Sequence, residues 1–155
     1  MRIQSSAFEN YSSIPTLYTC EGERFLSPPL EFFDVPEEAK SLVLIMEDPD
    51  VPRPVREDGL FVHWILFNIP SRTSNFKEGE SVGVHGANTR GEPRYTGPCP
   101  PLEYEPQQHR YVFTFYALDI ELFLTVGVAK EEILAMTEGH ILTQAELVGV
   151  YKKQA

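Results

Sequence analysis

Four side chains in this sequence carry groups that are common in acid–base chemistry, metal binding and anion binding. Asp48 and Asp50 belong to the run DPDVPRP, whereas His63 and His109 each lie within a run of apolar and aromatic residues. Carboxylates and imidazoles can orient one another, hold a phosphate or an ammonium group, ligate a metal ion, or transfer protons during hydrolysis. Which of these they could do depends on the elements that place them.

The run Tyr95–Pro101, YTGPCPP, predicts a shaped loop shortly before His109 and Tyr111. Proline fixes φ and has no N–H donor, and glycine tolerates dihedral angles that other residues avoid, so this composition excludes a helix or an interior strand. Backbone N–H groups of such a loop and the N–H of a histidine can both donate to phosphate oxygens. Because carboxylates repel a phosphate dianion, we expect Asp48 and Asp50 to orient the histidines or to meet the ammonium of a zwitterionic ligand.

The sequence predicts a mainly β fold, because short apolar runs are separated by Pro, Gly and charged turns. Runs rich in β-branched and aromatic residues predict four strands, at Leu42–Met46, Phe61–Ile69, Arg110–Leu118 and Leu147–Tyr151. The second and third are apolar on both faces, which is typical of central strands covered on both sides. Helical spacing predicts one short helix between Ala129 and Glu138, with Gly139 as its C-terminal stop.

Alternation along three of these strands places a titratable residue at the end of each apolar row. Asp48 continues the face of Leu42, Leu44 and Met46, His63 shares the face of Phe61, Ile65 and Phe67, and His109 shares that of Tyr111, Phe113 and Phe115. If the first strand runs antiparallel to the other two, Asp48, His63 and His109 meet at one rim of the sheet. Arg110 then points to the opposite face from His109, where we expect an ion pair with a carboxylate.

Composition favours one globular domain, residues 1–155, with 42% hydrophobic residues. The formal net charge of -10 disfavours nucleic acid and anionic membranes as partners. We find neither a secretory signal nor an apolar window of the roughly 18 residues that a membrane span needs, so we expect a cytoplasmic protein without integral membrane association. In a reducing compartment Cys20 and Cys99 should be free thiols, with a redox-labile pair as the alternative.

Four motifs follow one another between Thr19 and Asp119. They are TCEG with SPPL, DPDVP, the His63–Trp64 pair within a strand, and YTGPCPP followed by HRYVFTFYALD. Together they resemble the signature of the phosphatidylethanolamine-binding proteins, and GPCPP with the trailing YALD resembles the bacterial and archaeal Raf-kinase-inhibitor-like branch of that family. The segment Leu102–Gln108 departs from the pattern, because it is acidic and lacks the usual glycine.

The resemblance implies a β-sandwich with a predominantly antiparallel central sheet, a short helix in the C-terminal region and a small anion-binding cavity. Carried over motif by motif, the cavity is lined by Asp48, Asp50, His63, Gly97, Pro98, His109 and Tyr111. The segments around Cys20 and Cys99 both border this cavity in the family, so the two residues should be close. The resemblance also raises the expectation of a cis peptide bond between Val51 and Pro52.

Two classes of function remain open. The favoured one is a non-catalytic binding protein for a small anion, namely phosphate, a phosphorylated group or a phospholipid headgroup; regulation of a partner protein stays open. The alternative is a hydrolase, or a hydrolase inhibitor, that uses the Asp/His cluster. We expect no cofactor and no native metal, because the cluster lacks spacings such as HxH or HExxH. Cys99 lies between prolines rather than at a helix N-terminus, so a catalytic thiol is disfavoured.

Overall fold

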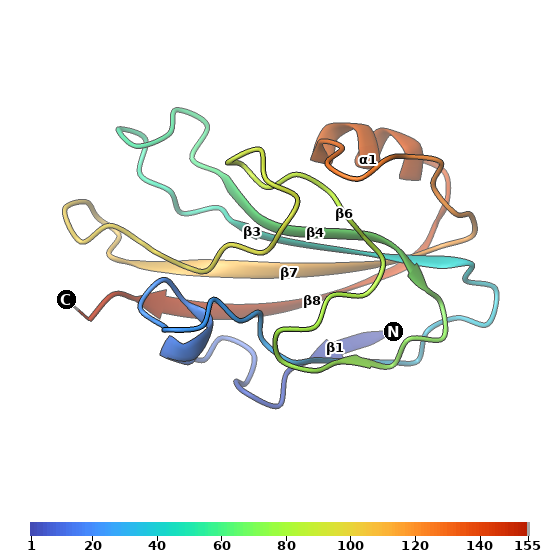
Figure 1. Cartoon of the computed structure of the whole chain (residues 1–155), viewed down its shortest axis with the longest axis horizontal. Coiled ribbons are helices and arrows are strands. Elements are labelled where there is room, and N and C mark those ends of the chain that lie inside the picture. Colours follow the sequence, from blue (N-terminus) through green and yellow to red (C-terminus); the bar gives the residue numbers. More distant parts are fainter. Residues whose placement is uncertain (155) are drawn as a thin grey trace.

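A five-stranded antiparallel sheet forms the centre of the protein in the computed structural model, which describes residues 1–154 (Figure 1). Its strands, in spatial order, are β6 (Val84–His85), β4 (Phe61–Pro70), β3 (Ser41–Asp48), β7 (Gln108–Leu118) and β8 (Ile141–Lys152). The four strands predicted from apolar runs are confirmed as β3, β4, β7 and β8, although β8 begins six residues earlier than the predicted Leu147. The expected antiparallel pairing of β3 with both β4 and β7 is also confirmed.

A second, smaller sheet covers one face of the first, which gives the sandwich that was expected. It contains β1 (Arg2–Gln4), β2 (Leu30–Phe33) and β5 (Asn75–Phe76). The helix α1 (Lys130–Thr137) lies on the other side of the five-stranded sheet (Figure 1). It ends close to the predicted position, and Gly139 follows with a φ of +81°, a conformation that favours glycine. A 3-10 helix, η1 (Thr16–Tyr18), completes the regular structure.

Apolar side chains fill the space on both sides of β3, as expected for a central strand. Leu42, Leu44 and Met46 pack toward the small sheet, in a cluster that includes Phe32 and Phe76. Val43 and Ile45 pack into a second cluster that includes Ile133 of α1. These β3 side chains are at most 2% exposed, so the strand is fixed from both faces.

A β-bulge in β4 breaks the simple alternation on which the sequence reasoning relied. Met46 pairs with Trp64, but the next residue of β3, Glu47, pairs with Val62, so His63 is one extra residue without a direct partner. Ile65 and Phe67 pack on the α1 side of the sheet. The prediction that His63 shares their face was therefore wrong: the bulge turns His63 toward the other side, where Asp48 and His109 lie.

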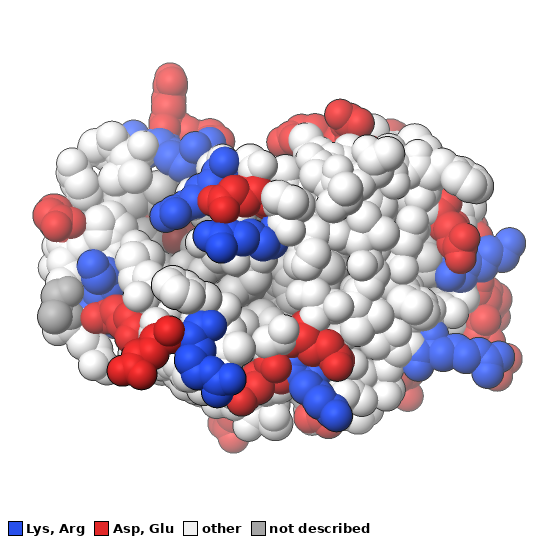
Figure 2. Space-filling view, viewed as in Figure 1, with Lys and Arg blue, Asp and Glu red and all other residues white. Residues whose placement is uncertain are grey.

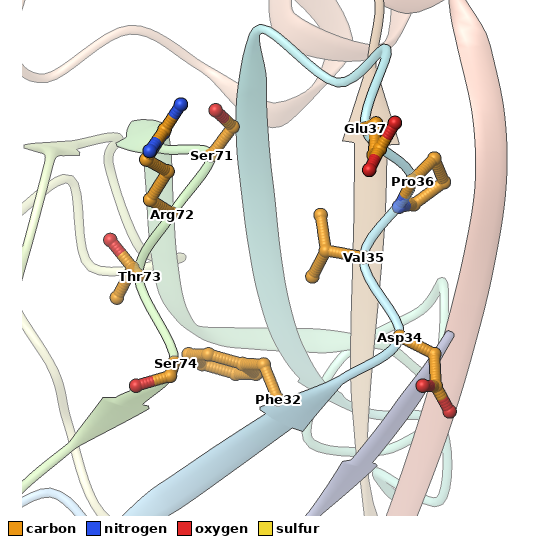
Figure 3. A pocket seen from close by; sticks show the side chains of 9 residues that line it. All are labelled: Phe32, Asp34, Val35, Pro36, Glu37, Ser71, Arg72, Thr73 and Ser74. Atoms are coloured by element: carbon orange, nitrogen blue, oxygen red, sulfur yellow. The ribbon is translucent and has the colours of Figure 1, made fainter.

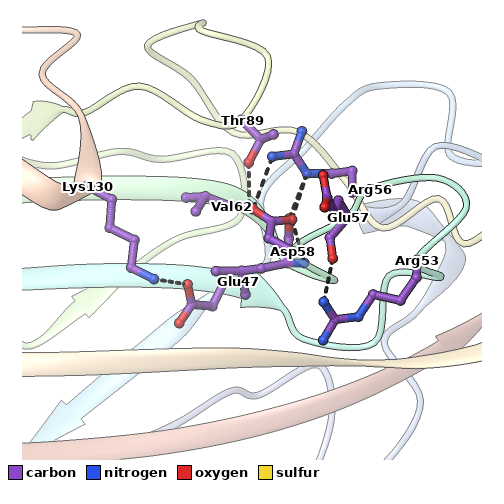
Figure 4. Close-up of polar contacts among 9 residues, drawn as sticks. Glu47, Arg53, Arg56, Glu57, Asp58, Val62, Thr89 and Lys130 are labelled. Carbon is purple, nitrogen blue, oxygen red and sulfur yellow. Dashed lines mark hydrogen bonds and ion pairs between the residues drawn. The ribbon is translucent and has the colours of Figure 1, made fainter.

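The outer edge of β4 at this bulge is covered by a loop rather than by another strand. The Val62 N–H donates to the Thr89 side-chain oxygen at 2.7 Å, and the Thr89 N–H donates back to the Val62 carbonyl at 3.0 Å (Figure 4). Further along, the Thr96 N–H donates to the His63 carbonyl at 3.0 Å. These contacts hold the segment from 89 to 96 beside the N-terminal end of β4.

Two local expectations are corrected by the structure. Cys20 and Cys99 form a disulfide, with Cα atoms 5.4 Å apart, rather than two free thiols. The predicted proximity of their segments is confirmed, and it is this proximity that allows the bond, since disulfides need Cα separations of roughly 4.4–6.8 Å. The Val51–Pro52 bond is trans; the one cis bond in the described part of the chain joins Glu105 to Pro106. No helix among residues 1–154 combines the length and apolar character that crossing a bilayer requires.

Candidate functional site

A cavity of about 150 Å³ opens at the rim where β3 ends and β4 and β7 begin. Asp48, His63 and His109 all line it, so the three residues that strand phase placed at one rim do meet there. The remaining lining residues are Val51, Val55, Phe61, Arg90, Thr96, Gly97, Cys99, Pro100 and Pro101. They come from the loop after β3, the start of β4 and the loop before β7.

A larger hollow, of about 740 Å³, lies at the opposite end of β3 (Figure 3). It separates the segment Phe32–Glu37 from the segment Ser71–Ser74 and carries Arg72, Asp34 and Glu37 at its walls. None of the buried polar side-chain atoms that lack a hydrogen-bond partner in the described residues belongs to this hollow. Two of those atoms, in contrast, belong to His109 and Tyr111 beside the smaller cavity, which is therefore the stronger candidate site.

Asp48 and His109 form a buried polar pair that lines this cavity. His109 Nδ1 lies 2.6 Å from Asp48 Oδ2, and both side chains are buried, at 1% and 5% exposure. The other carboxylate oxygen, Asp48 Oδ1, accepts from the Asp50 N–H at 2.8 Å. Because the carboxylate accepts from Nδ1–H, the orientation of the His109 ring is fixed. The second nitrogen of the ring is not used by this bond. That nitrogen, His109 Nε2, is buried and has no partner in the described residues.

His63 has a different hydrogen-bond partner from His109. Its Nδ1 lies 2.7 Å from the Thr96 carbonyl oxygen, to which it donates. Burial lowers the pKa of His63 to about 4, because desolvation disfavours the imidazolium. At neutral pH the ring is therefore uncharged, with the proton on Nδ1 and a lone pair on Nε2. His63 therefore offers the cavity a hydrogen-bond acceptor.

Tyr111 packs behind both histidines rather than on the cavity surface. Its ring centroid lies 5.3 Å from that of His63 and 6.4 Å from that of His109. Burial raises the pKa of its hydroxyl, so the group stays protonated, and the oxygen has no hydrogen-bond partner in the described residues. Tyr111 was predicted to line the cavity, but it packs beside the two imidazoles instead. It contributes a buried, neutral hydroxyl next to them.

Residues 96–101 form one wall of the cavity, and this wall lies very close to the chain around η1. A Cβ atom placed on Gly97 would lie 2.8 Å from the Tyr18 carbonyl oxygen, so only glycine fits there without a shift of the backbone. The Pro98 carbonyl accepts from the Cys20 N–H at 3.0 Å, and the disulfide follows at the next residue. Gly97 lines the cavity as predicted, whereas Pro98 is used for this contact and does not line it.

Asp50 is directed away from the cavity. Its carboxylate accepts two hydrogen bonds from the Arg110 guanidinium, at 2.8 and 2.9 Å, and a third from the Arg110 N–H. The Arg110 bonds hold the pKa of Asp50 below its ordinary value. The ion pair expected for Arg110 is therefore confirmed, and its partner is one of the residues that the sequence had assigned to the cavity.

Arg90 is a charged residue at the cavity that sequence reasoning missed. It is exposed, it lines the cavity, and it makes no ion pair within residues 1–154. The turn NTRGEPR that contains it carries only a turn signal, and nothing in its spacing connects it to His63. The hydrogen bonds between Thr89 and Val62 place it there. Figure 2 shows basic and acidic side chains mixed over one face of the protein rather than gathered by sign. Arg90 supplies positive charge at the cavity of a protein whose net charge is -10.

Comparison with known proteins decides the family. A sequence profile described as phosphatidylethanolamine-binding protein matches residues 4–152. This chain belongs to the phosphatidylethanolamine-binding protein family. A UPF0098 protein of Chlamydia trachomatis is 51% identical over 154 residues, which cover 99% of both chains, and one of Methanothermobacter thermautotrophicus is 42% identical over 160 residues, again at 99% of both. The family resemblance noted in the sequence is confirmed.

Solved structures agree with the phosphatidylethanolamine-binding protein fold. A crystal structure of a homologue of this family from Chlamydia trachomatis has a TM-score of 0.93 and 51% identity, and the match covers 99% of this chain and 97% of that one. YbcL of E. coli, described as a member of the mammalian family, has a TM-score of 0.84 at 24% identity, covering 99% and 98% of the two chains. The second likeness supports the fold alone.

The donor set at the cavity does not form a metal centre. Within residues 1–154 no group of three or more His, Cys, Asp and Glu side chains is arranged to hold a metal ion. Asp48 and His109 are engaged with each other, and the proton on His63 Nδ1 is engaged with Thr96. What the cavity offers is one lone pair, one unpartnered buried imidazole nitrogen and one cationic side chain.

Proposed function

We propose that this member of the phosphatidylethanolamine-binding protein family is a non-catalytic binding protein that holds one phosphate group in the cavity at the end of β3. The group is either free phosphate or the phosphate of a small zwitterionic headgroup such as phosphorylethanolamine. A phosphorylated side chain of a partner protein presents the same chemistry. The volume of about 150 Å³ is smaller than the roughly 300–1,000 Å³ of pockets for drug-sized ligands, which favours a ligand of this size.

The observation that carries the proposal is the buried, unpartnered Nε2 of His109. Leaving a buried polar atom without a hydrogen bond costs roughly 1–3 kcal/mol, so such an atom beside a cavity indicates a missing partner. Asp48 holds the Nδ1 side of the ring at 2.6 Å, so Nε2 is the ring nitrogen left to pair with a phosphate, which presents oxygen acceptors and, as the monoanion, a hydroxyl donor. Arg90 at the mouth adds a second cationic donor.

His63 would contribute an acceptor in this arrangement. The lone pair of its neutral ring can accept from a ligand donor, such as the hydroxyl of a phosphate monoanion or the ammonium of a headgroup. A fully deprotonated phosphate would meet that lone pair unfavourably. The proposal therefore includes a preference for ligands that present an acceptor and a donor together.

The test is calorimetric titration of the protein with inorganic phosphate and with phosphorylethanolamine. The variant is His109→Asn, because the asparagine amide can replace Nδ1–H toward Asp48 while Nε2 is removed. We expect the loss of one charge-assisted hydrogen bond, about 1.5–3 kcal/mol, which corresponds to roughly 10- to 150-fold weaker binding. Circular dichroism checks that the variant is folded.

The matched control is His140→Asn, since His140 also pairs with an aspartate, Asp119, at 2.8 Å but lies away from the cavity. We expect it to bind phosphate as the unchanged protein does. Equal affinity of His109→Asn and His140→Asn would reject the cavity as the phosphate site. Turnover of p-nitrophenyl phosphate by the unchanged protein, lost in His109→Asn, would instead favour the hydrolase alternative, because an Asp–His pair can also act as a general base.

A further inference from the structure

The wall of the phosphate cavity is covalently tied to a segment that lies 79 residues earlier in the chain. Cys99 lines the cavity itself, and the disulfide joins it to Cys20. A second hollow, of about 130 Å³, opens on the other side of the wall and is lined by both cysteines together with Phe25 and Arg94. Both cysteines are exposed. A thiol in solution therefore has a path to the disulfide that does not pass through the phosphate cavity.

Hydrogen bonds to other segments hold the first half of the wall, whereas the second half is held by packing, with Pro100 buried. The first half is held by the bond from the Thr96 N–H to the His63 carbonyl and by that from the Cys20 N–H to the Pro98 carbonyl. From residue 99 to the start of β7, the hydrogen bond found among the described residues is a local one, from Gln107 Nε2 to the Leu102 carbonyl. Pro100 and Pro101 have no N–H to donate. Among the described residues, the disulfide is thus the last bond that joins the wall to another segment before the chain enters β7.

The partner segment at Cys20 is itself well anchored. The Thr19 hydroxyl donates to the Thr16 carbonyl at 2.8 Å. Glu21 accepts from the Tyr151 hydroxyl of β8 and from the Gln154 N–H. The disulfide therefore connects the Pro-rich loop to a segment that Glu21 ties to the last strand of the central sheet.

We propose that the Cys20–Cys99 disulfide is a thiol-exchange site whose cleavage lowers the affinity of the cavity for phosphate; the phosphate part of this statement rests on the proposed function. The chemistry needs a dithiol as co-reactant. A thiolate of the dithiol attacks one sulfur of the pair, forms a mixed disulfide and releases the other cysteine as a thiolate. The second thiol of the reagent then resolves the mixed disulfide, so that the protein gains two electrons and two protons and the reagent becomes a cyclic disulfide.

Cleavage weakens binding because it increases the conformational freedom of the wall. In the disulfide form the backbone of Cys99, Pro100 and Pro101 is positioned before the ligand arrives. In the dithiol form these residues can take up further conformations, and the ligand has to order them. Fixing one additional backbone residue costs roughly a factor of ten in affinity. His63 and Asp48 lie on strands and keep their positions, so binding weakens without being abolished.

The experiment measures phosphate affinity by calorimetry in the oxidised protein and after reduction with dithiothreitol, with free thiols counted in each sample. The double variant Cys20→Ser/Cys99→Ser is measured under both conditions. We expect phosphate to bind the oxidised protein at least about tenfold more tightly than the reduced protein, since at least one wall residue is released. The double variant should bind like the reduced protein and should not respond to dithiothreitol. Reoxidation should restore the tighter binding.

The outcomes separate this inference from the proposed function. Phosphate binding by the oxidised protein that is equal in the reduced protein overturns the switch and leaves the proposed function standing. Absence of phosphate binding in both forms overturns the proposed function and the switch with it. Loss of the near-ultraviolet and far-ultraviolet dichroism on reduction would show that the disulfide holds the whole fold, and this would also overturn the switch.

Discussion

An aspartate–histidine pair lies at each end of β7, and the two pairs differ sharply in exposure. His109, at the start of β7, pairs with Asp48 at 2.6 Å; Asp119, just after its end, pairs with His140 at 2.8 Å. The side chains of the first pair are 1% and 5% exposed, and those of the second 41% and 44%. The ring nitrogen that the exposed pair leaves free is open to water. The free ring nitrogen of the buried pair has no such water contact, and this is why we propose that a ligand binds there.

The two pairs should differ most in their contribution to the free energy of unfolding, which is measured by replacing the aspartate of each pair with alanine. Asp48→Ala should lower the free energy of unfolding by about 3–5 kcal/mol, because breaking a buried pair leaves a buried ring unpartnered. The same change also removes the acceptor of the Asp50 N–H. Asp119→Ala should cost at most about 1 kcal/mol, because exposed pairs contribute little. Urea denaturation at constant pH measures both values, and similar costs for the two variants would remove the distinction drawn here.

A second prediction uses the other buried histidine of the cavity. The pKa of His63 is lowered from 6.5 to about 4 by burial, so the unfolded chain binds more protons than the folded one between these values. The stability due to the neutral ring is complete above pH 6.5 and is lost as the pH falls toward 4, by roughly 3 kcal/mol in total. His63→Gln should show a shallower decline of unfolding free energy over this window. Parallel curves for the two proteins would indicate that His63 is protonated as easily in the folded state as in the unfolded one.

A third ion pair, which is exposed but bidentate, should contribute as little to stability as the exposed histidine pair. Arg110→Ala should cost about 0.5–1 kcal/mol of stability, because the Arg110 side chain is 54% exposed and surface pairs are screened. Phosphate affinity should not change, since Asp50 faces Arg110 rather than the cavity. A change of more than about threefold, or about 0.7 kcal/mol, in calorimetric affinity would return Asp50 to the ligand site where the sequence placed it.

Long apolar strands were predictable from sequence, and short ones were not. β3, β4 and β7 are runs of eight or more residues with apolar side chains on both faces, so their composition alone identifies them. β5 and β6 have two residues each, and β1 has three. Such segments become strands because a neighbouring strand offers hydrogen bonds, and this information is not in their own residues.

Candidate residues on strands were predicted better than their partners in loops. Asp48, His63 and His109 were placed at one rim because each terminates an apolar row, although His63 arrives there through a bulge that alternation does not reveal. The positions of Arg90 and the partner of Asp50 depend on long-range contacts between loops. The disulfide is similar, because compartment arguments predicted free thiols while the packing of Gly97 against Tyr18 brings the two cysteines within bonding range.

The bulge in β4 affects how proteins of this family can evolve. Phe61 and Val62 are in register with Asp48 and Glu47, and Trp64 with Met46, so both apolar faces are specified without the residue between them. That residue, His63, is buried against Tyr111 and lines the cavity, so a replacement of similar size changes the cavity while both apolar faces keep their register. Descendants of one ancestor could alter what the cavity accepts by substitutions at a single position, while the genes continue to encode the same sandwich.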